Sequence, residues 1–342
     1  MPNPVLTEAI DRLCRGEALT SGEAEGVLDE VMAGRASETQ TAGLLIAFRT
    51  KGETVPEIAG MARAMRAVAV AVDPRATDLV DTAGTGGGRP TFNVSTTAAF
   101  VAAGAGCRVA KHGNRSATGR SGSADVLEAL GARIDLQPEQ VAACIDELGF
   151  GFMFAPGHHP AMRHVIPVRK ALAVRTIFNF LGPLTNPAGA SRQLIGVSDR
   201  RFLDIVAGAL GELGCDHGLV VSSDDGLDEL SVCGPTRVVE LEGGRLHAHE
   251  ITPASVGLST APQAALAAGT PEKNAGIARR VLEAGAGPER DVTVLNAGAA
   301  IYVGGGADSI EAGVRAAEMA IDCGAARDVL ERFVARTREL AP

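Results

Sequence analysis

The sequence predicts an α/β protein: a small all-helical N-terminal domain, then a large α/β domain with a central, mostly parallel sheet flanked by helices. Three observations support this. Apolar residues recur at three- and four-residue spacing up to about residue 70, and beyond it short apolar strands alternate with helices. The chain has 342 residues and is 46% hydrophobic, which suffices for two domains with buried cores. We therefore expect a helical domain over residues 1–70 and an α/β domain over residues 71–342.

Four helices are expected in the first domain, and capping residues bound them. Ser and Thr are common N-caps, and Gly commonly ends a helix. The expected helices cover residues 5–16, 22–34, 39–52 and 57–70, with Thr20 or Ser21, Ser37 and Thr54 as N-caps and Gly34 and Gly52 as stops.

Strands and helices alternate through the second domain, which favours parallel strands joined by helical crossovers. We expect strands over residues 78–82, 107–111, 151–155, 192–198 and 217–223, and a hairpin over residues 240–250 that turns at Gly243 and Gly244. Helices are expected over residues 95–104, 123–130, 138–148, 160–172 and 201–213, and the last 80 residues are predicted to be helical.

Composition excludes several classes of function. Thirty-two Lys and Arg against 41 Asp and Glu give a net charge of −9, which disfavours nucleic-acid and anionic-membrane partners. No apolar run is long enough to span a bilayer and the first residues lack a secretory-signal layout, so we expect a cytoplasmic protein. The six cysteines have neither metal-ligand nor CxxC spacing, and we expect them to be reduced and buried.

A glycine-rich loop follows the first expected strand of the large domain and precedes a helix. It reads DTAGTGGG over residues 81–88, and Asn93, Ser95 and Thr96 open the helix. Glycines let backbone N–H groups approach a ligand, and a helix N-terminus attracts anions. The loop has neither the Gly-Lys-Ser/Thr of a Walker motif nor the GxGxxG of a dinucleotide site. We interpret it as a phosphate cradle rather than only a tight turn.

Two other loops carry charged residues. KHGNRSATGRSGSAD over residues 111–125 offers cations and hydroxyls that can neutralise a diphosphate. DDGLDE over residues 224–229 offers carboxylates, which suit Mg²⁺ but also occur in solvated acidic loops. Arg169 offers a fork for a carboxylate, whereas the histidines at 158, 159 and 164 lack zinc-ligand spacing. Together these residues predict a Mg²⁺-assisted enzyme acting on a phosphate or diphosphate with an acidic second reactant, by charge neutralisation and positioning.

These motifs closely resemble the anthranilate phosphoribosyltransferase family over nearly the whole chain. The resemblance rests on TQTAGLLIAFRTKGETVPEIAG, GTGG, TFNVST, KHGNRS with SGSADVLEALG, GFMFAPGHHPAMRHVIPVRK, RTIFNFLGPLTNP and DDGLDEL. It implies a Mg²⁺-dependent glycosyltransferase of tryptophan biosynthesis that transfers the ribosyl group of phosphoribosyl diphosphate to anthranilate. It also implies a homodimer formed through the helical domain, helices near residues 160–190 packed on that domain, and an active site in the cleft between domains.

The resemblance further implies roles for individual residues. Phosphoribosyl diphosphate would be bound by Gly84, Gly87, Gly88, Thr91, Asn93, Val94, Ser95, Thr96, Lys111, His112, Gly113, Asn114, Arg115, Thr118, Gly119 and Ser123. Anthranilate would be bound by Gly84, His112, Asn114, His159 and Arg169, and Mg²⁺ by Ser95, Asp228 and Glu229. No residue is assigned as a general acid or base, because Lys111 and the metal would stabilise the leaving diphosphate.

Two positions depart from the family pattern. Many members read GTGGD where this chain has Gly88, in a loop about one residue shorter, and many have a Ser-Ser pair where it has Thr118 and Gly119. Two alternatives remain open: a pyrimidine nucleoside phosphorylase, which shares KHGNRS and SGSAD, and a non-catalytic relative that binds nucleic acid. Arg169, the acid pair Asp228–Glu229 and the negative net charge argue against them.

Overall fold

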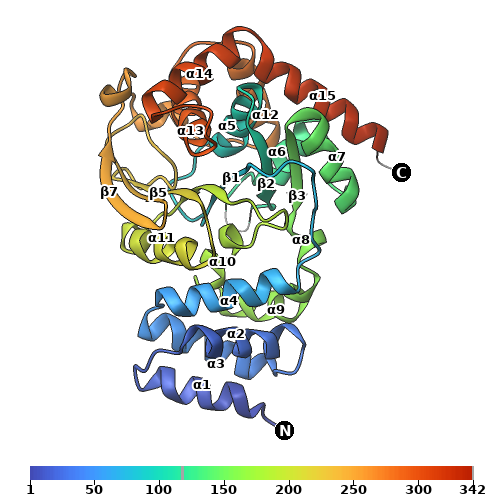
Figure 1. Ribbon diagram of the computed structural model, residues 1–342, viewed down its shortest axis with the longest axis vertical. Coiled ribbons are helices and arrows are strands. Elements are labelled where there is room, and N and C mark those ends of the chain that lie inside the picture. Colours follow the sequence, from blue (N-terminus) through green and yellow to red (C-terminus); the bar gives the residue numbers. More distant parts are fainter. Residues whose placement is uncertain (117–118, 341–342) are drawn as a thin grey trace.

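The computed structural model describes residues 1–116 and 119–340. Four helices at the N-terminal end stack below a seven-stranded sheet, and further helices cover both faces of that sheet (Figure 1). The predicted fold class, a small helical domain followed by a large domain with a mostly parallel sheet, is confirmed.

The N-terminal helices begin and end near the expected residues. They are α1 (Pro4–Cys14), α2 (Ser21–Met32), α3 (Glu38–Lys51) and α4 (Val55–Ala67), and their N-caps include Thr20, Ser37 and Thr54. Gly52 ends α3 with φ of 91°, a conformation that favours glycine. Gly34 follows α2, and a Cβ there would lie 2.7 Å from Cε1 of His164. Glycine at position 34 therefore lets a distant segment pack closely on α2.

The central sheet has the strand order β3-β2-β1-β4-β5-β6-β7. Its strands are β1 (Leu79–Gly84), β2 (Arg108–Gly113), β3 (Phe150–Phe154), β4 (Arg192–Gly196), β5 (His217–Ser223), β6 (Thr236–Glu242) and β7 (Arg245–Ile251). The first five are parallel, and β6 and β7 form the expected antiparallel hairpin. The carboxyl ends of the parallel strands therefore share one edge, where ligands bind in open α/β sheets.

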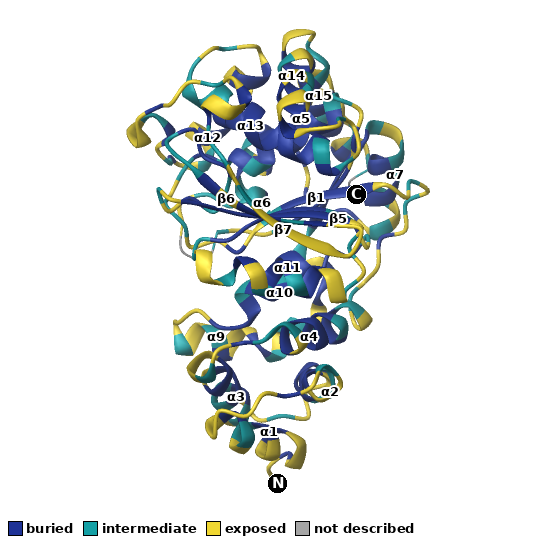
Figure 2. Ribbon diagram, turned by 60° about the vertical axis from the view of Figure 1, so that its left-hand side comes forward, coloured by how far each residue is buried: buried dark blue, intermediate teal, exposed yellow. Residues whose placement is uncertain are grey.

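Helices on the two faces of the sheet enclose two separate cores. One face is covered by α5 (Val94–Gly104), α6 (Ser123–Leu130), α7 (Pro138–Leu148), α12 (Pro271–Leu282), α13 (Pro288–Val303), α14 (Ile310–Asp322) and α15 (Ala325–Leu340). The other is covered by α11 (Leu203–Glu212) and α4, below which the remaining N-terminal helices lie (Figure 2). On β5, Leu219 and Val221 enter the first core and Val220 enters the second. Because strand side chains alternate, the sheet is shared between both cores.

The segment between β3 and β4 runs down to the N-terminal helices. It contains α8 (Ala155–His158), a 3₁₀ turn (Pro160–His164), α9 (Ile166–Leu172) and α10 (Phe178–Leu184). α9 contacts α3, and α10 contacts α4. The single helix expected over residues 160–172 is wrong, because Pro167 cannot donate a backbone hydrogen bond inside a helix and instead opens α9. Residues 200–202 likewise form a 3₁₀ turn ahead of α11, and the residue pattern alone did not predict α10.

All six cysteines are free thiols, but they are not all buried. Cys107 and Cys144 are buried and Cys215 and Cys233 are half-buried, whereas Cys14 and Cys323 are exposed at helix ends. The expectation of burial is therefore wrong for these last two. Within residues 1–116 and 119–340, no helix combines the length and the apolar character needed to cross a membrane.

Candidate active site

Three loops meet at the carboxyl edge of the sheet. We call residues 84–93, after β1, the glycine loop; residues 113–123, after β2, the phosphate loop; and residues 224–229, after β5, the acidic loop. Arg89 of the glycine loop donates to the carboxylate of Asp225 over 2.8 Å, and the backbone N–H of Arg89 donates to Gly226 over 2.8 Å. Two loops 136 residues apart in the chain are thereby held together.

The acidic loop places a carboxylate at the start of α5. Oε1 of Glu229 accepts a hydrogen bond of 2.9 Å from the backbone N–H of Ser95. Burial, with the neighbouring charge of Asp228, raises the pKa of Glu229 to about 8. Oε2 of Glu229 and Oγ1 of Thr96 are both buried without a hydrogen-bond partner among the described residues. Buried polar atoms normally have partners, so these two atoms indicate a missing polar ligand.

The glycine loop lies directly over Asp228. Burial raises the pKa of the Asp228 carboxylate, and the nearby backbone of Gly86 partly opposes this shift. A Cβ at Gly88 would lie 2.5 Å from Oδ1 of Asp228, and one at Gly84 would lie 2.9 Å from Oδ2. In this conformation only glycine therefore fits at position 88.

The residues present fit a divalent cation at this place. Asp228 and Glu229 are adjacent half-buried carboxylates whose pKa values are raised by burial, which a bound cation would reverse. The part of the chain that the structure describes contains no group of three His, Cys, Asp or Glu side chains that could hold a metal. Mg²⁺ commonly binds one or two carboxylates and completes its shell with water and substrate phosphates. The pair therefore fits Mg²⁺ that arrives with an anionic substrate.

Lys111 is buried in β2 beneath the glycine loop. The residue is 2% exposed, and its ammonium donates to the Thr82 carbonyl and, over 3.1 Å, to the Thr82 hydroxyl. Burial lowers the pKa of Lys111, while the charges of Asp81 and Glu229 oppose this shift. Asp81 is itself buried, and it accepts hydrogen bonds from the backbone of His112 and from Asn186. The Lys111 ammonium is thus kept close to Asp81, Glu229 and β1.

The phosphate loop is held at both ends. Asn114 and Ser123 exchange hydrogen bonds of 3.1 and 3.2 Å, and the N–H of Gly119 donates to Ser116 over 2.7 Å. Arg115 forms ion pairs with Asp125 and Glu128 of α6, so its guanidinium is already engaged by the protein. Thr118, predicted to bind phosphate, lies outside the described residues.

The remaining residues predicted for phosphoribosyl diphosphate lie around these loops. Val94 is buried in the first turn of α5, and Thr91 forms a backbone bridge with Ala267. Gly113 ends β2 against Ser123, and Gly87 lies against the guanidinium of Arg175.

Two uncharged histidines lie side by side near the phosphate loop. The rings of His112 and His159 lie 5.1 Å apart between centroids. Burial is the main reason why the pKa of His112 falls to about 3 and that of His159 to about 4, so both are neutral near pH 7. The Nε2 atom of each ring is buried without a partner in the described structure. Each can therefore give or accept one hydrogen bond to a bound molecule.

Helix α10 contacts both Arg169, which lies on α9, and His112. The guanidinium of Arg169 stacks over the ring of Phe178, 5.6 Å from its centroid, and the ring of His112 contacts the carbonyl of Gly182 over 3.3 Å. Phe178 and Gly182 are four positions apart, so they lie on one face of α10 about 6 Å apart. The described residues give Arg169 no carboxylate partner. Its guanidinium is therefore available for a carboxylate on a ligand.

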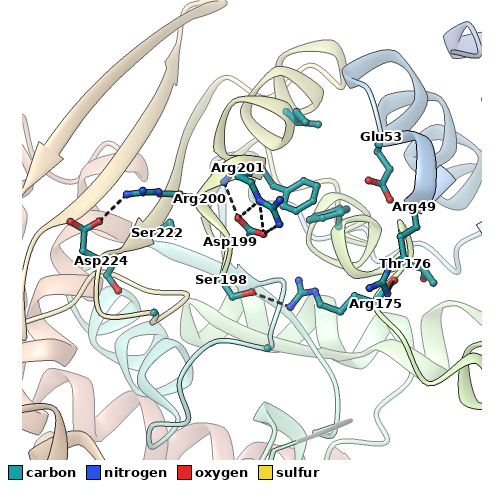
Figure 3. Close-up of a pocket in the computed structure, with 17 residues that line it drawn as sticks. Arg49, Glu53, Arg175, Thr176, Ser198, Asp199, Arg200, Arg201, Ser222 and Asp224 are labelled. Atoms are coloured by element: carbon teal, nitrogen blue, oxygen red, sulfur yellow. Dashed lines mark hydrogen bonds and ion pairs between the residues drawn. The ribbon is translucent and has the colours of Figure 1, made fainter. Parts of the chain in front are cut away.

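A cavity of about 1020 Å³ borders the glycine loop at Gly87 (Figure 3). It is lined by residues that follow β4 and β5 together with Arg49, Glu53 and Arg175. Of the predicted site residues that the structure describes, only Gly87 lines it. Arg175 donates to the Gly86 carbonyl over 2.8 Å and to Ser198 over 3.0 Å. The sequence does not predict this contact, although Arg175 begins the motif RTIFNF. The predicted residues thus meet beside this cavity, not within it.

Known proteins with a similar sequence and fold identify the family. The helical bundle domain of a glycosyl transferase family matches residues 7–69, and its a/b domain matches residues 76–327. An anthranilate phosphoribosyltransferase from Rubrobacter xylanophilus is 56% identical over 98% of this chain and 99% of its own. The chain belongs to the anthranilate phosphoribosyltransferase family. The predicted family resemblance is therefore confirmed.

Solved structures of family members agree with this assignment. The Thermus thermophilus anthranilate phosphoribosyltransferase has a TM-score of 0.92 and 49% identity, covering 96% of this chain and 99% of its own. The Saccharomyces cerevisiae enzyme, in complex with PRPP and Mg, has a TM-score of 0.89 and 28% identity over 98% of both chains. A second yeast structure, with a TM-score of 0.88 and 27% identity over 98% of both chains, is in complex with 4-fluoroanthranilate.

Proposed function

We propose that this protein is an anthranilate phosphoribosyltransferase of tryptophan biosynthesis. It transfers the 5-phosphoribosyl group of phosphoribosyl diphosphate to the amine of anthranilate, giving N-(5-phosphoribosyl)anthranilate and diphosphate. The observation that carries the proposal is the meeting of three loops at one edge of the sheet, with two acids, a buried lysine and polar atoms that lack partners. Full-length similarity to named family members supports the same activity.

The diphosphate end of the substrate would bind at the start of α5. Backbone N–H groups of the glycine loop, Asn93, Thr96 and Lys111 supply positive charge or hydrogen-bond donors there. Asp228, Glu229 and Ser95 would hold Mg²⁺, which neutralises charge on the leaving diphosphate. Asn114, Gly119 and Ser123 of the phosphate loop would bind the other phosphate.

Anthranilate would bind beside Arg169, His112 and His159. Arg169 is suited to its carboxylate, because a guanidinium binds a carboxylate through two parallel hydrogen bonds. The neutral His112 and His159 offer partners to the amine without adding charge near the developing cation. The C1–O bond to diphosphate breaks, the N–C1 bond forms, and the amine nitrogen then loses its proton to solvent water. Positioning and leaving-group stabilisation account for the rate without a dedicated general base.

The decisive experiment follows the fluorescence of anthranilate. Purified protein is mixed with anthranilate, phosphoribosyl diphosphate and Mg²⁺. One control omits phosphoribosyl diphosphate and another omits Mg²⁺. We expect loss of fluorescence only in the complete mixture. No loss, together with phosphate-dependent cleavage of a pyrimidine nucleoside, would move the assignment to the phosphorylase.

Dimerisation through the helical domain and a cytoplasmic location are also part of this proposal. The exposed side chains of Val5 on α1 and Ile46 on α3 support a partner surface, since they are 44% and 37% exposed on helices that pack together. Light scattering should give twice the chain mass for the wild-type protein. Val5→Glu with Ile46→Glu should shift that mass toward the monomer.

A further inference from the structure

Asn274, in the first turns of α12, contacts the glycine loop although 181 residues separate it from Asn93. Its side chain is 1% exposed. Nδ2 of Asn274 donates to Oδ1 of Asn93 over 3.0 Å, and Oδ1 of Asn274 accepts from the backbone N–H of Gly269 over 2.9 Å. Neither the motifs nor the spacing of the sequence indicated a role for Asn274.

Two backbone groups fix the orientation of both amides. The N–H of Gly269 can only donate, so it must meet the oxygen of Asn274, and the nitrogen of Asn274 then faces Asn93. The carbonyl of Ser121 can only accept, and it receives Nδ2 of Asn93 over 3.1 Å. Oδ1 of Asn93 is correspondingly held by Asn274 and by the Ser121 hydroxyl, at 3.0 and 2.9 Å. A flip of either amide would bring like atoms together.

Asn93 occupies the N-cap position of α5, but its side chain does not cap the helix. Its side chain makes no capping hydrogen bond to α5, and the N–H of Ser95 is bound by Glu229 instead. One hydrogen of Nδ2 goes to Ser121, and the second has no acceptor in the described structure. Asn93 therefore presents a spare donor, not an acceptor, at the α5 N-terminus.

We propose that Asn274 is a positioning residue: it fixes the amide of Asn93 so that Nδ2 donates to a phosphate oxygen of phosphoribosyl diphosphate. The inference rests on the proposed function and extends it to a residue outside every motif. If Oδ1 faced the substrate instead, an acceptor would oppose an anion. Asn274 thus contributes to affinity for phosphoribosyl diphosphate without touching it.

The test is Asn274→Asp, assayed at alkaline pH so that the new carboxylate is ionised. One carboxylate oxygen still accepts from Gly269, while the other replaces the donor that faces Asn93. Since a hydrogen bond to a charged group is involved, we expect KM for phosphoribosyl diphosphate to rise about tenfold or more. KM for anthranilate should stay within about twofold. Because Asn274 acts through Asn93, adding Asn274→Asp to an Asn93→Ala variant should change KM for phosphoribosyl diphosphate little further.

A structural control and a second readout separate positioning from instability. Thr337→Val, in α15, removes a buried hydroxyl that accepts a hydrogen bond from the backbone N–H of Arg133. It should lower the melting temperature without moving either KM. Thermal stabilisation by phosphoribosyl diphosphate with Mg²⁺ reports binding without turnover, and it should shrink in Asn274→Asp.

Three results would overturn the inference. These are equal changes in both KM values, full additivity with Asn93→Ala, or unchanged stabilisation by the diphosphate substrate. If the wild-type protein binds phosphoribosyl diphosphate but is inactive, the result would instead count against the proposed function.

Discussion

Gly88 lies so close to Asp228 that its lack of a side chain is a requirement of the site. We expect Gly88→Ala to displace the acid, since its Cβ would also lie 2.9 Å from the backbone nitrogen of Asp228. Overpacking of this kind costs about 1–3 kcal/mol, seen here as weaker binding of Mg²⁺ and phosphoribosyl diphosphate. Kinetics at varied Mg²⁺ measure this. Gly276→Ala, where a Cβ would meet nothing within 4 Å, is the control. Normal kinetics in Gly88→Ala would show that the glycine loop leaves Asp228 when substrate binds.

Arg169 is the residue on which recognition of the acceptor is proposed to depend. Arg169→Ala should raise KM for anthranilate by about 10- to 100-fold, because a charge-assisted pair is lost. KM for phosphoribosyl diphosphate should change little. The neighbouring exposed Lys170→Ala serves as the control and should leave both values near wild type. Equal losses for both substrates in Arg169→Ala would refute its assigned role.

The histidine pair makes stability depend on pH. His112 and His159 have pKa values lowered from 6.5 to about 3 and about 4, so below pH 6.5 the unfolded chain binds protons that the folded protein does not. Stability therefore falls as pH drops from about 6.5 toward 4, by up to about 1.4 kcal/mol per pH unit for each histidine. Urea unfolding at several pH values measures the slope. His159→Asn should make it shallower, whereas the same slope would show that other groups cause it.

At the scale of elements, helix α4 depends on a buried acid. Glu57 is fully buried, and it accepts hydrogen bonds from the backbones of Leu19 and Thr54 and pairs with Lys51 at 2.8 Å. Glu57→Ala would leave Lys51 buried and unpaired, so we expect a loss of about 3–5 kcal/mol in unfolding free energy. Thermal unfolding tests this. Glu23→Ala removes the exposed capping box of α2, and it should cost much less. Equal effects of the two variants would contradict this account.

Element boundaries were predicted well where local signals determine them. The hairpin turned at Gly243–Gly244 as expected, and helix 138–148 matched α7 at both ends. The elements that were missed depend on distant contacts. Helix α10 is apolar around most of its surface because α4 and Phe202 cover it, so it shows no amphipathic pattern. The break before Pro167 was readable from the proline, but helical spacing on both sides of it obscured the signal.

The same limit applies to the site. The three loops were predicted because glycines, cations and acids cluster locally after strands. Asn274, Arg175 and the pair Arg89–Asp225 make contacts across 89 residues or more, which leave no local pattern. The sequence could not show that Glu229 caps α5, because that depends on how β5 lies relative to β1.

At the scale of the whole molecule, the shared sheet predicts cooperative unfolding. The core of the N-terminal helices is continuous with Val220 and Ile195 on the lower face of the sheet. We therefore expect backbone amides of α4 and β5 to lose protection from hydrogen exchange at the same denaturant concentration. If the amides of α4 exchange while those of β5 stay protected, the helical region unfolds independently. Helix α1, which is remote from the sheet, serves as an internal reference for local fraying.

That shared core also has a consequence during synthesis on the ribosome. The apolar faces of α3 and α4 are completed by residues 165–184 and by α11, so they emerge long before the residues that cover them. At bacterial and eukaryotic rates of roughly 5–20 residues per second, the delay is on the order of ten seconds. During that interval the nascent N-terminal helices expose apolar surface, which makes them the natural first substrate for ribosome-associated chaperones.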